Sequence, residues 1–411
     1  MRVLRGVGRC FTGTGAGVIE HAAVAVGDDG RIAWVGPDGA RPPAAPRGRP
    51  VLEEDCDGAL LTAGLIDAHT HPVYAGARLA EIARRTAGAS YAELAAAGGG
   101  IAATVAATRA EAPATLATLV AARLGRWLRE GTTTVEAKTG YHLERQGELW
   151  ALDCLRALDG APGLPRVVAT YLGAHGVPAD WPGGRSAYVQ AVADWAPAAA
   201  AAGARACDVF CDAGAFTVAE SRRILRAGRA AGLRLRIHAD ELERTGGAEL
   251  AAELGADSAD HLLRVTAEDA HRLAAAGVVA TLAPVTALAM HQRPPARLLQ
   301  AAGVTLALAT DHNPGTSGIT SMSLVVGLAV LDLGLSVTEA LRAATAGGAQ
   351  SLRLPDRGTV APGQLGDLVL WDADHEGAFA WALGLRPRRV WRGGEPVVPS
   401  PSPPDPRPGP V

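Results

Sequence analysis

Residues 64–72 read GLIDAHTHP and place two histidines, His69 and His71, directly after a short apolar run. Because successive side chains of a β-strand point to opposite faces, histidines two positions apart lie on the same face. Two such imidazoles can bind one metal ion, although a His-x-His pair alone is weak evidence. The significance of the pair therefore depends on whether the rest of the chain forms a sheet that brings further ligands to this strand.

Short β-rich runs alternate with longer segments of helical character through the middle of the chain. The candidate strands are 65–69, 132–138, 167–172, 206–210, 233–238, 257–260, 278–282 and 304–310. Eight strands, each followed by a helix, indicate a closed parallel barrel rather than an open doubly wound sheet. We therefore predict an α/β fold, a (β/α)8 TIM barrel with its chemistry at the carboxyl ends of the strands.

The two ends of the chain have a different pattern. Residues 1–58 contain short apolar runs cut by Gly and Asp pairs, and similar runs return between 363 and 397. This pattern predicts small antiparallel strands and turns. We predict a small composite β-sandwich domain from residues 1–58 and 356–397, a barrel of residues 59–355, and a disordered proline-rich tail at 398–411.

Composition excludes several classes of protein. The 411 residues are 48% hydrophobic and 20% charged, as in a soluble globular protein, and the net charge of -3 offers no basic surface for nucleic acid. No stretch approaches about 20 uninterrupted apolar residues, so we expect no membrane span. The five cysteines form no disulfide framework, which agrees with a reducing, cytoplasmic location. Cys207 and Cys211 flank an apolar run and are expected to be buried thiols rather than a metal pair.

Four candidate metal ligands stand at the ends of predicted barrel strands. His69 and His71 belong to the first strand, His238 ends the fifth and Asp311 ends the eighth. Three imidazoles and one carboxylate suit zinc, iron or manganese. We predict one metal site at a rim of the barrel, where the ion lowers the pKa of a bound water and makes hydroxide available near neutral pH.

Three residues at the same rim are candidates for proton transfer and charge stabilisation. Asp311 can take the proton of the attacking water, and Glu241, three residues after His238, can carry a proton to a leaving nitrogen. His261, after the sixth strand, can polarise the carbonyl under attack. The alternatives are a surface carboxylate at a helix start for Glu241 and a hydrogen-bonded core histidine for His261.

These residues resemble the metal site of the amidohydrolase superfamily, in which a His-x-His strand, a fifth-strand His and an eighth-strand Asp hold one metal. Between about residues 55 and 395, the stretches that resemble the imidazolonepropionase family are HTHPVYAGAR, GASYAELAAAGGGI, TTTVEAKTGY, YLGAHGVP, DVFCDAGAF, IHADEL, GGAELAAELGADSADHL, TDHNPGTS and DLVLWDADH. The resemblance implies a hydrolase that opens the ring of 4-imidazolone-5-propanoate to N-formimino-L-glutamate in histidine degradation. It also implies a zinc or iron cofactor and a homodimer.

By position, the resemblance also implies a role for each matching residue. The implied metal ligands are His69, His71, His238 and Asp311, and His261 would assist catalysis. The implied substrate contacts are Arg78, Tyr91, Tyr141, His175, Glu241, Asn313, Gly315 and Thr316. In two-metal members of the superfamily a carboxylated lysine bridges the metals. Because this chain resembles the single-metal members, we interpret Lys138 as structural or as a residue that supports the metal ligands without binding the ion.

The chemistry of a propionate agrees with part of this assignment. A propionate needs a cation, and the guanidinium of Arg78 can bind it in bidentate fashion. The alternatives are a solvated loop charge for Arg78, a packing role for Tyr141, a loop histidine bonded to the backbone for His175, and a turn residue for Asn313. For the last three residues, the functional interpretation rests mainly on their position in the family motifs.

Two other functions remain open. An aminohydrolase acting on a purine-type heterocycle would share the metal ligands, but its substrate has no propionate for Arg78 to hold. A barrel kept as a scaffold without catalysis would usually have lost ligands, and none is missing. His142, His312 and the segment TLAPVTALAM (281–290) depart from the family pattern, which affects the expected substrate specificity rather than the metal site.

Overall fold

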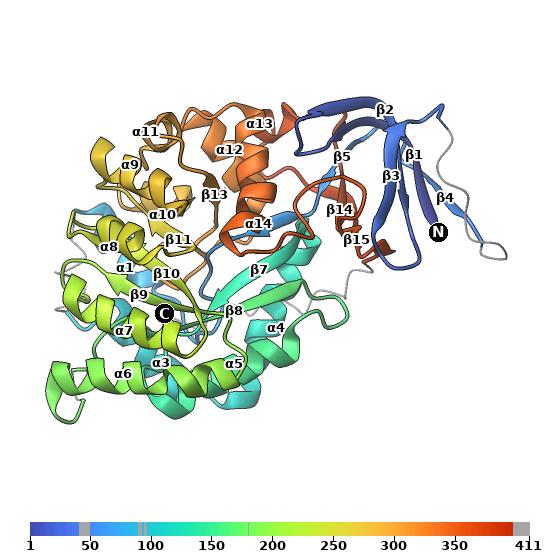
Figure 1. Cartoon of the computed structure of the whole chain (residues 1–411). Helices are drawn as coiled ribbons and strands as arrows, with labels where there is room; N and C mark the ends of the chain where they lie inside the picture. Colours follow the sequence, from blue (N-terminus) through green and yellow to red (C-terminus); the bar gives the residue numbers. More distant parts are fainter. Residues whose placement is uncertain (41–49, 89–92, 94–96, 180, 398–411) are drawn as a thin grey trace.

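The larger part of the protein is a barrel of parallel strands (Figure 1). The structure is a computed structural model, which describes residues 1–40, 50–88, 93, 97–179 and 181–397. Neighbouring barrel strands pair in chain order from β6 to β13. The strands are β6 (Leu65–Asp67), β7 (Thr132–Lys138), β8 (Arg166–Ala174), β9 (Ala206–Cys211), β10 (Arg234–Ala239), β11 (Ser258–His261), β12 (Val279–Leu282) and β13 (Leu306–Leu308). Each predicted strand overlaps one of them, so the predicted order is confirmed.

Main-chain hydrogen bonds between the segments after β6 and β13 close the barrel. The N–H of Asp311 donates to the carbonyl of His69 at 3.1 Å, and the N–H of His71 donates to the carbonyl of His312 at 2.8 Å. Thr70 and His312 form a parallel bridge between the same segments. Closure therefore brings the first and eighth strands of the prediction side by side at the rim.

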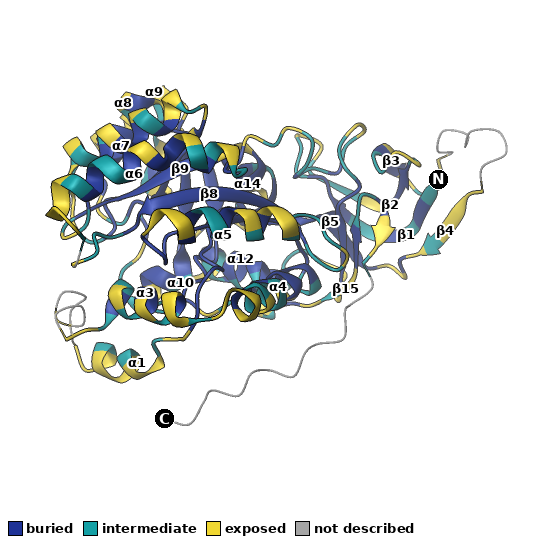
Figure 2. Ribbon diagram, turned by 90° about the horizontal axis from the view of Figure 1, so that it is seen from below, coloured by how far each residue is buried: buried dark blue, intermediate teal, exposed yellow. Residues whose placement is uncertain are grey.

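Helices cover the outside of the barrel, with exposed outer faces around buried strands (Figure 2). The helices are α1 (Leu79–Thr86), α3 (Gly100–Ala110), α4 (Pro113–Arg129), α5 (Arg145–Leu158), α6 (Gly184–Ala201), α7 (Val218–Ala230), α8 (Gly247–Leu254), α9 (Ala267–Ala276), α10 (Pro284–Ala289), α11 (Ala296–Ala301), α12 (Met322–Leu331), α13 (Val337–Arg342), the π-helix Ala343–Gly347, α14 (Gly348–Ser351) and α15 (Ala378–Trp381). Capping boxes define several starts; at α7 the Thr217 hydroxyl accepts from the N–H of Glu220, whose carboxylate accepts from the N–H of Thr217.

The two ends of the chain form one small β domain beside the barrel (Figure 1). Its strands are β1 (Arg2–Phe11), β2 (Val18–Val26), β3 (Ile32–Pro37), β4 (Leu52–Asp55), β5 (Leu60–Ala63), β14 (Leu368–Trp371), β15 (Pro387–Arg392) and β16 (Glu395–Pro396). The strands of the predicted composite domain are hydrogen-bonded into one mixed sheet, in which β5 joins β1 to β14. Leu4, Leu61, Leu368 and Trp391 pack in its core.

The chain passes from the small sheet to the barrel at Gly64, between β5 and β6. A Cβ at this position would overlap the side chain of Thr133 on β7, so the close approach of the two segments requires glycine.

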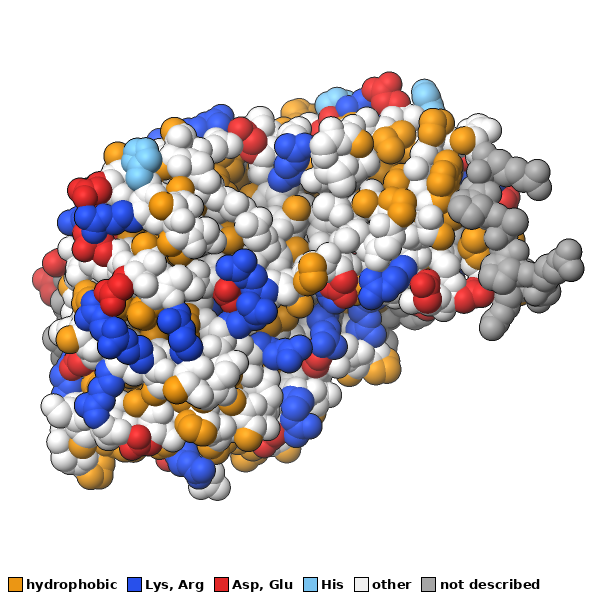
Figure 3. All heavy atoms as spheres, in the orientation of Figure 1, with side chains coloured by type: hydrophobic (Ala, Val, Ile, Leu, Met, Phe, Trp, Pro, Cys, Tyr) orange, Lys and Arg blue, Asp and Glu red, His pale blue; other side chains and the backbone are white. Residues whose placement is uncertain are grey.

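The predicted tail at 398–411 lies outside the described residues. Among the helices that are described, none has the length and apolarity needed to cross a membrane. On the face shown in Figure 3, basic side chains are mixed with acidic and apolar ones.

Candidate active site and metal centre

The four predicted metal ligands converge at the carboxyl end of the barrel. The Nε2 atom of His71 lies 3.1 Å from that of His69 and 3.4 Å from that of His238. The Oδ1 atom of Asp311 lies 3.5 Å from His69 Nε2 and 3.4 Å from His71 Nε2. All four side chains are buried. Residues from three distant parts of the chain thus direct four donor atoms into one small volume.

These separations fit the ligand set of a single ion. A tetrahedral ion with bonds of about 2.0–2.1 Å holds its ligand atoms about 3.3–3.4 Å apart. The Nδ1 of His69 lies 2.6 Å from Asp260, and the Nδ1 of His238 lies 3.1 Å from Asp208. These carboxylates favour a proton on Nδ1, so both Nε2 lone pairs face the centre of the cluster. Because lone pairs that face one another at this distance repel, a cation bound between them stabilises the arrangement.

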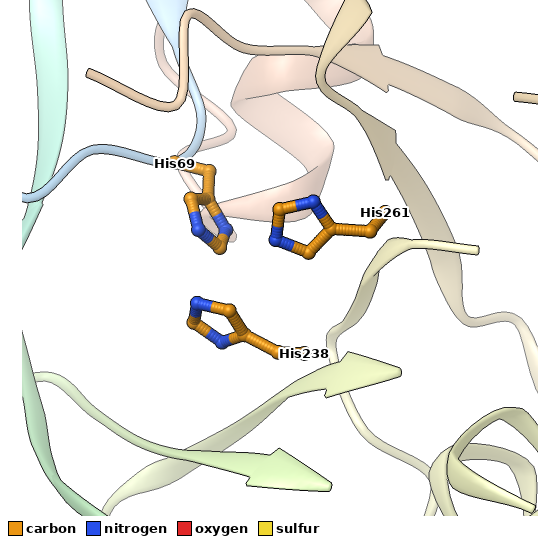
Figure 4. A group of neighbouring side chains, drawn as sticks. All are labelled: His69, His238 and His261. Carbon is orange, nitrogen blue, oxygen red and sulfur yellow. The ribbon is translucent and has the colours of Figure 1, made fainter. Parts of the chain in front are cut away.

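Further histidines border the same space. Figure 4 shows the rings of His69, His238 and His261 turned toward one another, and their ring nitrogens lie within 4.8 Å of one another. The ring of His175 stacks on that of His71 with centroids 4.9 Å apart, and its Nδ1 lies 3.0 Å from the carbonyl of Gly140. Burial lowers the pKa of His71 to about 4 and that of His175 well below its ordinary value. Both imidazoles are therefore neutral near pH 7.

Glu241 and Asp311 differ in their ionisation. Burial raises the pKa of Glu241 above its ordinary value, against the opposing influence of His261, whose Nδ1 lies 3.7 Å from its Oε1. Burial acts in the same direction on Asp311, but His71, His261 and the hydroxyl of Thr286 hold its pKa below the ordinary value. One carboxyl is thus biased toward the protonated form and the other toward the ionised form. Such a pair suits one proton donor and one proton acceptor.

Backbone strain accompanies these side chains. His261 has φ +74° and Asp311 has φ +47°, both in the left-handed region. Non-glycine residues occupy this region at a cost of order 1–3 kcal/mol, and such residues cluster at functional sites. His261 ends β11 and Asp311 follows the end of β13 by three residues, so both strained positions belong to the candidate site.

A buried charge network beneath the histidines is absent from the sequence prediction. Lys138 is fully buried, and its Nζ lies 2.8 Å from Asp208, 2.9 Å from Glu136 and 3.7 Å from Asp260. Arg236 also contacts Asp260, at 3.3 Å. Asp208 and Asp260 in turn orient His238 and His69. The interpretation of Lys138 as structural or as a support for the metal ligands agrees with this geometry. In the sequence, only the position of Asp260 near the end of a predicted strand pointed to a role at the site.

A cavity of about 1220 Å³ opens above the cluster. Its walls include ten of the residues singled out from the sequence: His71, Arg78, Tyr141, His175, His238, Glu241, His261, Asp311, Asn313 and Thr316. His69 is buried and is not among the described residues that line this cavity. Tyr91 lies outside the described residues, so its predicted contact stays a prediction.

Two of the predicted substrate contacts, Arg78 and Asn313, already form hydrogen bonds within the protein. Arg78 Nη1 donates to Thr104 Oγ1 at 2.7 Å, and a Cβ on Gly315 would overlap the guanidinium, so Gly315 makes room for Arg78. The Asn313 amide donates to the carbonyl of Asp311 and accepts from the N–H groups of Gly315 and Thr316. The turn role considered for Asn313 is therefore present, although the residue also borders the cavity.

The residues that depart from the family pattern lie mostly behind the cavity wall. The imidazole of His312 bonds the Tyr74 hydroxyl at 3.1 Å and the carbonyl of Ile319 at 2.9 Å. His142 packs against Trp150 with ring centroids 5.7 Å apart. The segment after β12 forms α10, and Met290 at its end reaches the cavity. Of these departures, the one after β12 changes the surface that a substrate would meet.

Comparisons with known proteins agree with this fold and identify its family. The model of the amidohydrolase family matches residues 73–398. The imidazolonepropionase of Bradyrhizobium sp. strain BTAi1 is 43% identical over 386 residues, which cover 92% of this chain and 94% of that protein. The imidazolonepropionase of Rhizorhabdus wittichii is 42% identical over 390 residues, covering 93% and 96%. That of Myxococcus xanthus is 44% identical over 366 residues, covering 88% and 86%.

Solved structures with lower identity share the fold. An adenosine deaminase from Xanthomonas campestris with bound zinc has a TM-score of 0.72 at 22% identity, covering 96% of this chain and 92% of that one. A zinc complex of atrazine chlorohydrolase from Arthrobacter aurescens has a TM-score of 0.74 at 19% identity, covering 97% and 95%. Because the family model spans most of the chain and the curated relatives match nearly its whole length, the chain belongs to the imidazolonepropionase family of amidohydrolases.

Proposed function

We propose that this chain hydrolyses 4-imidazolone-5-propanoate to N-formimino-L-glutamate in histidine degradation. The observation that carries the proposal is the four-donor cluster beneath a cavity that also holds a cation, Arg78. The relatives named imidazolonepropionase, at 42–44% identity, support the choice of substrate. A purine-type aminohydrolase is the alternative, since it would use the same donors.

One divalent ion, zinc or iron, is the proposed cofactor, held by His69, His71, His238 and Asp311. When bound, such an ion acts as a Lewis acid and lowers the pKa of a water molecule. The same donor atoms suit more than one transition metal, so the zinc in the related structures supports zinc without excluding iron.

The reaction needs one water, one broken bond and two proton movements. Water oxygen adds to the ring carbonyl carbon, and the bond between that carbon and the ring nitrogen breaks. Asp311, biased toward its ionised form, accepts a proton from the water. Glu241, biased toward its protonated form, delivers a proton to the departing nitrogen. His261 polarises the carbonyl oxygen, where negative charge develops.

Substrate binding is assigned to the upper part of the cavity. Arg78 faces the propionate, and Thr104 and Glu81 fix its guanidinium, with Glu81 3.3 Å from Nε. Tyr141 and His175 form one wall, with ring centroids 5.0 Å apart. His175 has its Nδ1 directed to the carbonyl of Gly140, which leaves Nε2 for a ligand. Thr316 and Asn313 also border the cavity.

An absorbance assay that follows loss of the imidazolone ring tests the proposed function. The purified protein should open the ring, lose this activity on chelation, and regain it when zinc or iron is restored, because the nucleophile depends on the ion. Adenosine and guanine serve as comparison substrates for the purine-type alternative. Turnover of a purine without turnover of the imidazolone would reject the proposal, as would full activity after complete removal of the metal.

Replacing Arg78 with methionine tests the carboxylate contact. We expect KM for the imidazolone to rise by about 10- to 100-fold, because a charge-assisted hydrogen bond to the propionate contributes about 1.5–3 kcal/mol. Metal content should stay unchanged, since Arg78 is not one of the four donor residues. Arg388→Met, a change on the surface of the small sheet, should leave KM unaffected. An unchanged KM in the Arg78 variant would favour a substrate without a carboxylate.

Assembly and location are proposed from the surface and the cysteines. We propose a homodimer, supported by exposed apolar side chains on the adjoining helices α12 and α15: Trp381 is 89% exposed and Leu331 61%. Light scattering of the sample used for metal analysis measures its mass.

The five cysteines are free thiols, which suits a reducing compartment such as the proposed cytoplasm.

A further inference from the structure

Asp212, which follows β9, binds the backbone of the loop that carries Glu241. Its Oδ2 accepts hydrogen bonds from the N–H groups of Glu241 at 2.7 Å and Leu242 at 2.9 Å. Its Oδ1 accepts from the N–H groups of Glu243 at 3.0 Å and Ala213 at 2.7 Å. Asp212 is 3% exposed, so this carboxylate is ordered by main-chain donors in the interior of the protein.

The backbone of the loop is shaped to receive this carboxylate. Asp240, directly before Glu241, has φ +50°, which turns the chain so that three consecutive N–H groups point the same way. Consecutive main-chain N–H groups at such a turn form a concave anion site. The carboxylate of Asp240 is used elsewhere, because it accepts from the N–H groups of residues 245–248 at the start of α8. The segment that begins at Glu241 therefore depends on Asp212.

We infer that Asp212 is a positioning residue that sets the place of the Glu241 carboxyl relative to the donor cluster and His261. The inference rests on the proposed function of Glu241 as the proton donor to the leaving nitrogen. It is not a further ligand or base, since all of its hydrogen bonds described above go to main-chain N–H groups. It acts on the reaction through the backbone of residues 241–243.

Asparagine at position 212 changes this contact with almost no change in size. An amide has one accepting oxygen, so its NH2 group must face N–H donors that a carboxylate oxygen accepts in the native protein. Part of the loop then loses its acceptor and shifts. A misplacement of about 1 Å can lower a rate by about 100-fold, so we expect kcat to fall by about 10- to 100-fold with little change in KM or metal content.

A double-mutant cycle separates positioning from a general structural role. Glu241→Gln alone should lower kcat by about 10²- to 10⁴-fold. Asp212→Asn should then cause no further fall in the Glu241→Gln background, because residues that act as a unit are not additive. An equal fall in both backgrounds would overturn the inference, and so would an unchanged kcat for Asp212→Asn alone. Asp212→Glu, which keeps both accepting oxygens, should retain more activity than Asp212→Asn.

Two further measurements complete the test. Asp159→Asn is the matched control, because Asp159 accepts from the N–H of Val167 at 2.8 Å at the opposite end of the barrel, and this variant should keep native kcat. If Asp212→Asn does not fold, the cycle is run with Asp212→Glu, whose longer side chain also displaces the loop. A native kcat for Glu241→Gln alone would reject the proposed role of Glu241, and this result is read independently of Asp212.

Discussion

Replacing Asp311 with asparagine is expected to lower kcat by about 10⁴-fold, the upper end of the range for loss of a general base. The amide cannot accept a proton at neutral pH, and it is a weaker ligand than a carboxylate. Asp311 Oδ1 lies 3.4 Å from His71 Nε2, and Oδ2 accepts from the Thr286 hydroxyl at 2.6 Å. One oxygen is thus directed to the cluster, and the other is held by a neighbour.

Steady-state kinetics and metal analysis of the same preparation check this prediction. If kcat falls while the ion is retained, Asp311 acts mainly by accepting a proton. If both kcat and metal content fall, Asp311 acts mainly as a metal ligand. Asp372→Asn is the control, because Asp372 is an exposed acid paired with Arg388 in the small domain. An Asp311→Asn enzyme with native kcat would contradict both proposed roles.

The sequence was sufficient to predict the barrel and the residues of the cluster. Most strands are short runs rich in apolar or β-branched residues, and they alternate with helical segments, so the count of eight follows from local pattern. Barrel geometry then directs the end of every strand to one rim. His69, His71, His238 and Asp311 stand at such ends, and closure through the Asp311–His69 hydrogen bond brings them together.

The residues that orient the cluster could not be predicted in this way. Asp208 is the only charged residue inside β9, and Asp260 is one polar residue among several in β11, so neither stands out in the sequence as a partner of the cluster. Their partners are His238, His69 and Lys138, on other strands, so the contacts exist only after the barrel has closed. Asp212 is similar, because its partners are backbone N–H groups of another loop. A backbone donor has no sequence signature.

Lys138→Met is expected to weaken metal binding by about 10- to 100-fold and to destabilise the protein by about 3–5 kcal/mol. Lys138 is the only lysine in the chain, in which every other basic side chain of the Lys and Arg class is arginine. It lies among Glu136, Asp208 and Asp260, and its removal leaves three buried carboxylates with one fewer cation, although Arg236 remains beside Glu136 and Asp260. Asp208 and Asp260 orient His238 and His69. Removing Lys138 therefore also disturbs the orientation of these two metal ligands.

The same variant should unfold at a higher pH when it is titrated with acid. Burial acts to raise the pKa of Asp208, but His238 and Lys138 lower it well below the ordinary value. A depressed carboxyl pKa stabilises the fold above the unfolded pKa of about 3.9, and this contribution is lost as the pH falls toward the folded value. Without Lys138 the depression is smaller, so protonation of Asp208, and unfolding with it, begins at a higher pH.

Chemical denaturation, acid titration and metal competition measure these three effects. Arg272→Met is the control, because Arg272 forms an exposed ion pair with Glu268, and exposed pairs of this kind contribute little to stability. Lys138→Arg keeps the charge but replaces a compact ammonium with a larger planar group in a closed space, so we expect it to recover only part of the stability. Native stability and metal affinity in Lys138→Met would show that Arg236 alone suffices for the buried carboxylates.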